Sequence, residues 1–465
     1  MRSSNSLSRR RFLIGAGAGA AGAVLAACGA TPTPQVVEKI VEATPQVVKE
    51  TVVVEVQVTP AGLQPADLAI WVWWPDPVAS LNQMAAYFMG ANPGVKVTAE
   101  APADYWTKLQ TALAGGAGPD IYFMNNVNYW SWASKGVLVD LDQLIAGDAS
   151  MQDNLKNSWT YAIEFYKFEG KNYGLPFMYT TVVLYYNEDY ITAEGLDAIV
   201  EIEDDFDWNQ WRENANKLTK REGDSVTMWG AMSTEGIETG WLNFVRANGG
   251  DFLNKESDKC IIDEAPSVEA WQLLTDMRLK DNVSPSPEAI QAENLRSMFM
   301  TGKIAMWPSG SWVMKTLNAQ LKDFKYNIAI LPKSPTTGGR GGTTNIVGLV
   351  MNKDTKFKDQ AWALMVHFLS KYSQDVFAKA DVLAPVRNDS AELYYDPVLG
   401  PANRRAAFKM QQWTTALPTH RKVTWGEMMQ PTGEWQTEIF EGRVGVQEGL
   451  TNMAAAVNDL FAKAG

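Results

Sequence analysis

The sequence has very little of the chemistry that builds metal sites and nucleophilic pairs. Its 465 residues include two histidines, His367 and His420, and two cysteines, Cys28 and Cys260. A structural zinc site needs about four Cys or His ligands, and a Cys–His pair needs one of each in contact. The chain also lacks G-x-S-x-G, G-x-x-x-x-G-K-S/T and H-E-x-x-H motifs. We therefore expect no metal, no cofactor and no catalytic site of these kinds.

Positive charge is also scarce. Lys and Arg number 41 against 53 Asp and Glu, which gives a formal net charge of −12. Residues 1–27 contain four Arg and no acid, so the remaining 37 basic and 53 acidic residues leave −16. This balance does not attract a phosphate backbone, so we expect no nucleic-acid partner. The hydrophobic share of 46% suffices for one large core or two smaller ones.

The N-terminus has the features of an export signal. A basic start leads into small and apolar residues, a run too short and too rich in Gly for a stable membrane span. SRRRFL at 8–13 resembles a twin-arginine signal, and LAAC at 25–28 resembles a bacterial lipobox. We predict that residues 1–27 are a signal peptide and that Cys28 becomes the lipidated N-terminus. Cys260 is then a lone cysteine with an expected buried, structural role.

Residues 28–66 differ in composition from the rest of the chain. They contain no aromatic residue, and they repeat TPQVV among prolines and alternating charges. Such a composition favours an extended chain, so we predict a flexible tether that follows the lipid anchor. The Val-rich stretch 51–58 leaves an edge strand open as an alternative.

From residue 67 onward, strand-like runs alternate with helical patterns. Helices are expected at 78–89 and 105–114, and the C-terminal part should be mainly helical. Strands are expected at 68–74, 95–100, 120–125, 181–187, 227–233, 303–307, 326–331 and 345–352. This alternation predicts the α/β class, in which ligands bind beyond the carboxyl ends of the strands.

Nine segments, read in order, resemble the landmarks of a known family. They are GPDIYFMNN, ASKGVLVDLDQLI, GKNYGLPFMYTTVVLYYNEDYI, WNQWRENANKLTK, WLNFVRANGG, FMTGKIAMWPSGSW, YNIAILPKSP, DQAWALMVHFLSK and LAPVRND. With the lipobox, they resemble the family 1 extracellular solute-binding proteins, the sugar receptors of ATP-binding-cassette importers, over almost the whole chain. The sequence departs from the family at 201–207, where acids replace a usual Pro and Thr. We interpret this run as a solvated loop whose Asp207 caps the next helix.

The resemblance implies a two-lobed periplasmic-binding-protein-like fold (type II), with a hinge crossed several times by the chain and the ligand in the interlobe cleft. Lobe one would hold 67–177 plus 350–390, and lobe two would hold 178–345 plus 391–465. Lobe closure would bury the ligand from both sides, and the closed form would be recognised by the permease. The implied partners are a mono- or oligosaccharide and the permease subunits, and we expect a monomer.

A sugar ring has an apolar C–H face and a rim of hydroxyls, so its receptor needs aromatic surfaces edged by hydrogen-bonding groups. The chain has 18 Trp, of which Trp71 and Trp229 are expected in the core. The candidate ligand rings are Trp73, Trp74, Trp130, Trp241, Trp307, Trp312 and Trp425.

The neighbouring sequence indicates which of these rings are expected to meet the ligand and which are expected to pack. Trp73 and Trp74 are adjacent in an expected strand, which would send the rings to opposite faces and leave Trp74 free. GKIAMWPSGSW at 302–312 predicts a strand, a Pro-Ser-Gly turn and a helix start. The family resemblance implies a sugar-binding ring at Trp312 and a late one at Trp425, whereas Trp307 is expected to pack against the turn.

The polar candidates are Asn125, Asn126, Tyr179, Thr180, Asn345 and Arg387. Amides can both donate to and accept from hydroxyls, although Asn126 could instead cap a helix. Asn345 follows GGRGGTT, whose glycines would let the backbone approach a ligand, and a plain turn is an equal alternative. Arg387 could bridge the lobes, meet a hydroxyl or form a surface ion pair.

The sequence is also compatible with two other functions. A glycoside hydrolase needs two carboxylates beside an aromatic cleft, and 53 acids supply many pairs. A receptor for a non-sugar solute would share the fold. We predict a non-enzymatic carbohydrate receptor, exported and lipid-anchored to the outer face of the cytoplasmic membrane.

Overall fold

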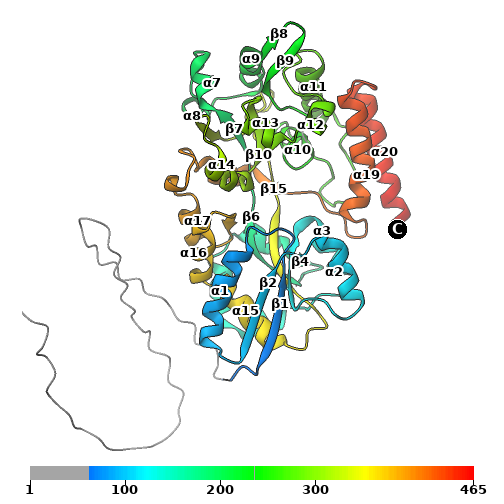
Figure 1. Cartoon of the computed structure of the whole chain (residues 1–465). Helices are drawn as coiled ribbons and strands as arrows, with labels where there is room; N and C mark the ends of the chain where they lie inside the picture. The colour runs from blue at the N-terminus through cyan, green and yellow to red at the C-terminus, as the bar shows by residue number, and fades with distance from the viewer. Residues whose placement is uncertain (1–61, 235, 465) are drawn as a thin grey trace, which may run out of the picture. The chain divides into compact units, whose positions relative to one another are not determined.

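A computed structural model describes residues 62–234 and 236–464 (Figure 1). The predicted signal peptide, Cys28, most of the tether and the alternative strand at 51–58 lie outside these residues. The described strands form a six-stranded sheet, a five-stranded sheet and two two-stranded pairings. None of the described helices combines the length and apolarity that a membrane crossing requires.

The six-stranded sheet has the order β14-β6-β13-β3-β1-β2. Its strands are β1 Ala66–Trp71, β2 Val95–Glu100, β3 Ile121–Asn125, β6 Gly174–Tyr179, β13 Ile346–Met351 and β14 Ala384–Pro385. β1 is parallel to β2 and β3, so the carboxyl ends of these three strands meet at one edge of the sheet. β13 is antiparallel to both β3 and β6.

The five-stranded sheet has the order β11-β7-β10-β9-β8. Its strands are β7 Val182–Asn187, β8 Lys220–Glu222, β9 Ser225–Ala231, β10 Ile304–Gly310 and β11 Tyr326–Ala329. Every residue of β7 and β10 is buried, as expected for strands covered on both faces. β9 and β10 are parallel, so their carboxyl ends also share an edge.

Helices and short elements cover these sheets. The helices are α1 Val78–Ala91, α2 Tyr105–Ala114, α3 Asn126–Ser134, α4 Asp142–Gly147, α5 Ala149–Lys156, α6 Thr160–Phe165, α7 Glu188–Ala193, α8 Ile199–Ile202, α9 Trp208–Leu218, α10 Trp241–Ala247, α11 Ala265–Leu279, α12 Pro287–Ala292, α13 Leu295–Met300, α14 Met314–Gln320, α15 Lys358–Leu369, α16 Lys371–Lys379, α17 Asn388–Tyr394, α18 Ala406–Met410, α19 Trp425–Phe440 and α20 Val446–Ala464. The other elements are the 3-10 turns η1 Ser311–Val313, η2 Pro397–Leu399 and η3 Gln411–Trp413, and the strand pairs β4 Lys167–Phe168 with β5 Lys171–Asn172 and β12 Gly342–Thr344 with β15 Thr414–Ala416.

The alternation of side chains along β3 shows how the six-stranded sheet is covered. Phe123 packs in the core cluster that includes residues of α1 and α15, whereas Tyr122 packs in the cluster that includes residues of α2 and α3. Successive strand residues point to opposite faces, and both faces are buried here. The run IYFM is therefore apolar or aromatic throughout instead of alternating with polar residues.

The chain passes directly from one sheet to the other. β6 and β7 belong to different sheets, and only Thr180 and Thr181 separate them. The backbone N–H of Thr180 donates to the carbonyl of Asn345 at 3.2 Å, so a second connection, just before β13, runs beside the first. The exact lobe boundaries given above stay a prediction.

The expected strands and the two expected helices are present, but several strands end elsewhere, and the ends of β1 and β10 matter most for the site. β1 ends at Trp71, so Trp73 and Trp74 lie in the loop before α1, and strand alternation does not govern their rings. β10 runs on through Pro308 to Gly310, paired with β7, where the sequence predicts a turn. β9 pairs with β10 only as far as Met306, so Pro308 lacks a neighbour on that side and removes no ladder bond.

The acidic run 201–207 is only partly the solvated loop that its composition predicts. Asp207 does cap α9, and the cap is a full capping box. Glu203, however, is buried, and its carboxylate pairs with the Lys409 ammonium. Its main chain is fixed by Arg340, whose guanidinium donates to the Glu203 carbonyl.

Cys260 has the structural role expected of it. Its side chain is buried and free of any disulfide among the described residues. Burial raises the pKa of its thiol to about 12, so the reactive thiolate form is disfavoured.

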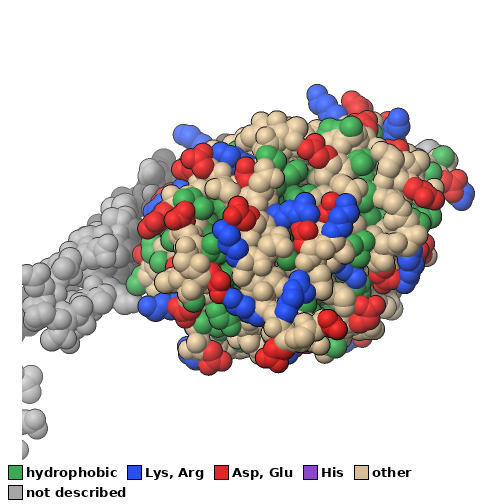
Figure 2. Space-filling view, turned by 90° about the horizontal axis from the view of Figure 1, so that it is seen from above, with side chains coloured by type: hydrophobic (Ala, Val, Ile, Leu, Met, Phe, Trp, Pro, Cys, Tyr) green, Lys and Arg blue, Asp and Glu red, His purple; other side chains and the backbone are tan. Residues whose placement is uncertain are grey.

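Figure 2 shows basic and acidic side chains interspersed over the face seen from above. α9 and α11 lie at the top of Figure 1 and so belong to this side. Arg212 of α9 pairs with Asp281, and Lys280 pairs with Asp276 of α11. The face drawn in Figure 2 therefore mixes both signs of charge and shows no continuous basic surface.

Candidate ligand-binding site

A pocket of about 350 Å³ lies at the carboxyl edge of the five-stranded sheet. It is lined by the loop after β9, the end of β10 with η1, one residue of α13 and the first residue of α19. The lining residues are Gly236, Ile237, Glu238, Thr239, Arg296, Trp307, Ser309, Trp312, Val313 and Trp425. Its size falls in the range of about 300–1,000 Å³ that is usual for small-molecule sites.

Trp312 is a half-buried ring of this pocket, held by the turn that follows β10. It lies in η1, two residues after the end of the strand. A Cβ added to Gly310 would lie 1.9 Å from Cζ3 of the Trp312 ring, so the ring rests directly on the Gly310 backbone. Gly310 is therefore needed for close packing and not for a turn, which corrects the interpretation of PSGS as a turn motif.

Trp307 lines the same pocket from within β10 and is 3% exposed. Its ring packs against Tyr185, with centroids 5.8 Å apart, and against Phe299 at 5.7 Å. The sequence predicts that Trp307 packs while Trp312 is the more accessible ring, and the burial of the two side chains agrees.

Trp425 enters the pocket as the first residue of α19 and is half-buried. The helix start is fixed by a capping box between Thr424 and Glu427. The Thr424 backbone N–H donates to Oε2 of Glu427 at 2.8 Å, and hydrogen bonds from Thr424 lower the pKa of Glu427. A capped helix end holds the indole in one place.

Glu238 is the acidic group of the described pocket lining, and sequence reasoning missed it. Burial raises the pKa of its carboxyl to about 7, and a hydrogen bond from Asn345 opposes that rise. The loop around it is tied down, because the Glu238 carbonyl accepts from Nδ2 of Asn243 at 3.0 Å and from the Thr343 hydroxyl. A carboxyl in this setting can accept hydrogen bonds from ligand hydroxyls when ionised.

Asn345 is the polar candidate that the structure brings to Glu238. It is half-buried, and its Oδ1 is buried with no hydrogen-bond partner among the described residues. Thr180 is buried beside it, and its hydroxyl accepts from the Asn345 backbone N–H at 2.9 Å. Thr180 therefore positions Asn345 through its hydroxyl oxygen.

Three of the glycines of GGRGGTT pack closely against other segments, whereas Gly338 has a φ of +68° and serves the backbone turn. A Cβ on Gly341 would lie 2.4 Å from the Asn243 carbonyl oxygen, and one on Gly339 would lie 2.7 Å from the Ala247 carbonyl oxygen. The loop thus approaches the backbone of α10 closely. At Gly339 and Gly341 the backbone thus approaches another chain segment, whereas the sequence suggests an approach to a ligand.

Asn125 and Asn126 lie at the end of β3 and the start of α3. Asn126 is fully buried; its Oδ1 accepts from the Ile346 N–H at 3.2 Å, and its Nδ2 donates to the Leu417 carbonyl at 3.4 Å. It joins three segments and caps no helix, since Asn125 is the N-cap residue. Asn125 is half-buried, and its Oδ1 accepts from Asn128 Nδ2 at 2.8 Å.

Tyr179 and Trp241 are core residues outside the described pocket lining. The Tyr179 hydroxyl lies 2.9 Å from that of Tyr395, and the side chain is 1% exposed. Trp241 is fully buried, and its N–H donates to Gln436 Oε1 at 2.9 Å. Neither side chain presents a free surface to a ligand, so we leave both out of the site.

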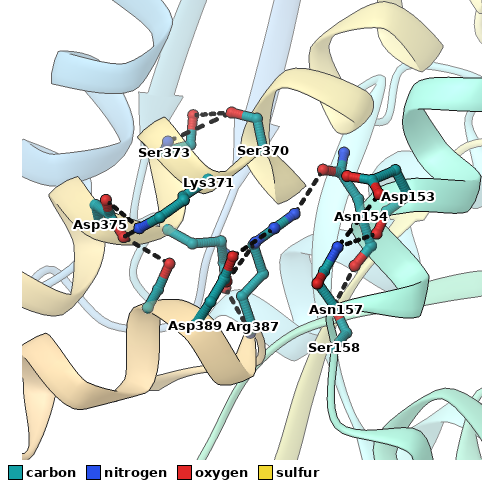
Figure 3. A network of polar contacts seen from close by, with 12 residues as sticks. Asp153, Asn154, Asn157, Ser158, Ser370, Lys371, Ser373, Asp375, Arg387 and Asp389 are labelled. Carbon is teal, nitrogen blue, oxygen red and sulfur yellow. Dashed lines mark hydrogen bonds and ion pairs between the residues drawn. The ribbon is translucent and has the colours of Figure 1, made fainter. Parts of the chain in front are cut away.

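Arg387 is the centre of a buried polar network (Figure 3). Its Nε and Nη2 donate to the two carboxylate oxygens of Asp389, each at 2.8 Å, and its Nη1 donates to Asn154 Oδ1 at 2.8 Å. The network ties α5 to the start of α17. Arg387 is therefore neither a surface ion pair nor part of the pocket lining.

Trp73, Trp74 and Trp130 lie on the side of the six-stranded sheet. The Trp73 and Trp74 centroids are 4.6 Å apart, so the two rings are neighbours instead of facing opposite sides. Trp130 stacks on Phe165 at 5.7 Å. Trp71 and Trp229 pack against the core, as expected, but remain half-buried.

Comparisons with known proteins agree with this architecture. A binding protein of Brucella abortus is 24% identical over 390 residues, which cover 81% of this chain and 88% of that protein. The lactose-binding protein of Rhizobium radiobacter is 23% identical over 276 residues, 57% of this chain and 61% of that protein. The structure of an ABC substrate-binding protein of Listeria monocytogenes in complex with cycloalternan superposes with a TM-score of 0.76 at 25% identity, covering 86% of this chain and 100% of that one.

The family profile of bacterial extracellular solute-binding proteins matches residues 73–375, well over half of the chain. The matched region includes both large sheets except β1 and β14, which lie outside it. The protein thus has the two-lobed fold of exported solute-binding proteins, and it belongs to the bacterial extracellular solute-binding protein family.

Proposed function

We propose that the protein is a carbohydrate receptor that captures a sugar in this pocket and delivers it to an ATP-binding-cassette permease. The observation that carries the proposal is the lining of one pocket by Trp307, Trp312 and Trp425 together with the Glu238 carboxyl. Indole rings provide flat surfaces for the C–H faces of a sugar, and a carboxylate accepts from hydroxyls at its rim.

The known relatives support a sugar as the solute. The relative from Rhizobium radiobacter is a lactose-binding protein, and the Listeria structure holds cycloalternan. A maltotriose-binding protein of Pyrococcus abyssi is similar over 70% of this chain. The ligands of these proteins differ, so they favour the saccharide class without selecting one sugar.

The composition of the pocket favours binding over hydrolysis. A glycosidase needs two carboxyl groups on either side of the bond that it cleaves. Among the described lining residues Glu238 supplies a carboxyl, and the remaining lining is apolar, hydroxylic or basic. We therefore propose a receptor without catalytic activity.

Export and anchoring belong to the same proposal. Membership of an extracellular family supports export. We propose that the twin-arginine-like signal directs it, that cleavage leaves Cys28 lipidated, and that residues 28–66 tether the receptor to the outer face of the cytoplasmic membrane. We further propose that it acts as a monomer, with lobes at 67–177 plus 350–390 and 178–345 plus 391–465 that close on the sugar.

A saccharide screen tests the function. The mature chain, residues 28–465 with Cys28→Ser to prevent lipidation, would be titrated by calorimetry with mono-, di- and oligosaccharides, and each mixture would be checked for products. A ligand at a hundredfold excess over its Kd should stabilise the fold by about 2.7 kcal/mol. Binding with the sugar recovered intact supports the receptor, whereas turnover, or no binding across all sugars, contradicts it.

A further inference from the structure

One of the two histidines of the chain, His420, lies in the segment that leads to the pocket ring Trp425. This segment, residues 417–424, connects β15 with α19, and Trp425 is the first residue of α19. The half-buried imidazole of His420 stacks on Phe461 of α20, with centroids 4.1 Å apart and planes 9° apart. A neighbouring helix therefore supports one face of the imidazole.

The Nδ1 atom of His420 accepts two backbone hydrogen bonds from its own segment. The Val423 N–H donates to it at 2.9 Å, and the Lys422 N–H donates to it at 3.2 Å. Because both donors point at Nδ1, the single ring proton of the neutral imidazole must be on Nε2. The side chain thus closes a turn over residues 420–423 and satisfies two backbone groups at the end of that turn.

The turn closed by His420 passes directly into the start of α19. Thr424, which follows the turn, is the N-cap residue of that helix, and Trp425 is its first residue. The other end of the segment is held at Leu417, whose backbone N–H donates to the Thr344 carbonyl at 3.2 Å. The imidazole therefore fixes the end of the segment that adjoins the pocket ring.

The surroundings of the imidazole favour its neutral form. Burial lowers the pKa of His420 below its usual value of 6.5, and the Lys422 and Arg421 cations of the same segment add to that effect. Asp258, from the loop before α11, opposes it, and the α20 side chain against the ring, Phe461, carries no charge. At neutral pH the imidazole is therefore an acceptor, and it takes up a second proton only in acid.

We propose that His420 is a positioning residue for the sugar: its neutral imidazole holds the turn that places Trp425, and its protonation releases that turn and lowers sugar affinity. This inference rests on the proposed function, in which Trp425 contacts the ligand. In the imidazolium ion both ring nitrogens carry hydrogen, so Nδ1 no longer accepts and its N–H faces the two backbone donors. The receptor then binds its sugar less tightly in acid than at neutral pH.

Two substitutions separate the acceptor of His420 from its charge. His420→Asn keeps an acceptor, because an Asn Oδ1 can close the same kind of turn onto backbone N–H groups two and three residues later, and it does not titrate. His420→Phe keeps a ring against Phe461 and removes the acceptor. His367→Phe, which removes the other histidine in α15, away from the pocket lining, is the matched control.

Calorimetric titrations of the mature chain with the best-bound sugar compare the wild type and these variants at about pH 7 and about pH 5. At the higher pH, His420→Asn should bind like the wild type, whereas His420→Phe should bind about fivefold or more weakly, as expected for two lost hydrogen bonds. On acidification, the wild type should lose about fivefold more affinity than His420→Asn, because both proteins share Glu238 and differ in the titrating imidazole. His367→Phe should follow the wild type.

Hydrogen exchange in residues 420–424 gives a readout that needs no sugar. After correction for the intrinsic exchange rate, the Lys422 and Val423 amides should lose protection in acid in the wild type and keep it in His420→Asn. The proposal is overturned if His420→Phe binds like the wild type, if His420→Asn loses as much affinity in acid as the wild type, or if this protection does not depend on pH. Absence of sugar binding in the wild type at both pH values overturns the proposed function itself, and the inference with it.

Discussion

The Trp312 ring lies on the bare backbone of Gly310, with 1.9 Å between the ring and the place where a Cβ would be. This contact fixes the position of Trp312, which is a half-buried ring of the pocket and follows the end of β10. The position of this half-buried indole therefore depends on the absence of a side chain at Gly310, two residues earlier.

Gly310→Ala should displace the Trp312 ring, because the new methyl group overlaps it. We expect sugar affinity to fall by about tenfold or more, and the free energy of unfolding to fall by about 1–3 kcal/mol from overpacking. Calorimetry and urea unfolding measure the two effects. Gly433→Ala in α19, where a Cβ meets no atom within 4 Å, should leave affinity unchanged. Unchanged affinity in Gly310→Ala would show that the ring position does not matter for binding.

Sugar affinity should depend on pH through Glu238, whose carboxyl has its pKa raised by burial to about 7. The ionised form accepts the stronger hydrogen bonds from hydroxyls, so affinity should fall as pH decreases through that value. Between about pH 8 and about pH 6 the ionised fraction drops roughly tenfold, and affinity should follow. Titrations across this range, beside a Glu238→Gln variant that should bind with little pH dependence, measure the effect. A wild-type affinity that stays flat or rises on acidification would refute this role.

His367 should make the fold sensitive to acid. Burial lowers the pKa of its imidazole from 6.5 to about 4, while the unfolded chain takes up the proton near pH 6.5. Its contribution to stability is therefore complete above about pH 6.5 and is lost as pH falls towards about 4.

The variant His367→Phe keeps a ring in place and removes this titration. Between about pH 7 and about pH 4.5, the unfolding free energy of the wild type should fall by up to about 2.5 kcal/mol more than that of the variant. Urea unfolding at both pH values measures the difference. Parallel losses in the two proteins would contradict a neutral, buried His367.

Arg387 should matter for stability and not for sugar. Replacing it with Met leaves Oδ1 of Asn154 without this donor and removes a bidentate pair with Asp389. We expect a loss of about 2–3 kcal/mol in unfolding free energy with affinity unchanged. Arg405→Met, which removes an exposed pair with Glu392, should cost less than about 1 kcal/mol. A selective loss of sugar binding in Arg387→Met would instead return Arg387 to the site.

The order of strands and helices could be read from the sequence because local periodicity determines it. The segments IYFM and VVLYYN are apolar runs of strand length, and both are buried strands. Pro308 and Gly310 were harder to interpret, since Pro, Ser and Gly usually mark turns. Here Pro308 lies on an open edge of β10 and Gly310 makes room for an indole, which are both consequences of tertiary packing.

The site was only partly predictable for the same reason. The family resemblance points to Trp312 and Trp425 as ligand rings, and both line the pocket. Glu238 is one acid among 53, and its place in the pocket depends on how the loop after β9 folds back onto Thr343.

The most direct test of sugar binding in this pocket is a calorimetric titration of Trp312→Ala with the best-bound sugar of the screen, beside the wild type and Trp229→Ala. Removing an indole that contacts the ligand should weaken binding by about tenfold to a thousandfold, while unfolding stays cooperative. Trp229→Ala should bind like the wild type. Wild-type affinity in Trp312→Ala would contradict the claim that this pocket is where the protein binds sugar.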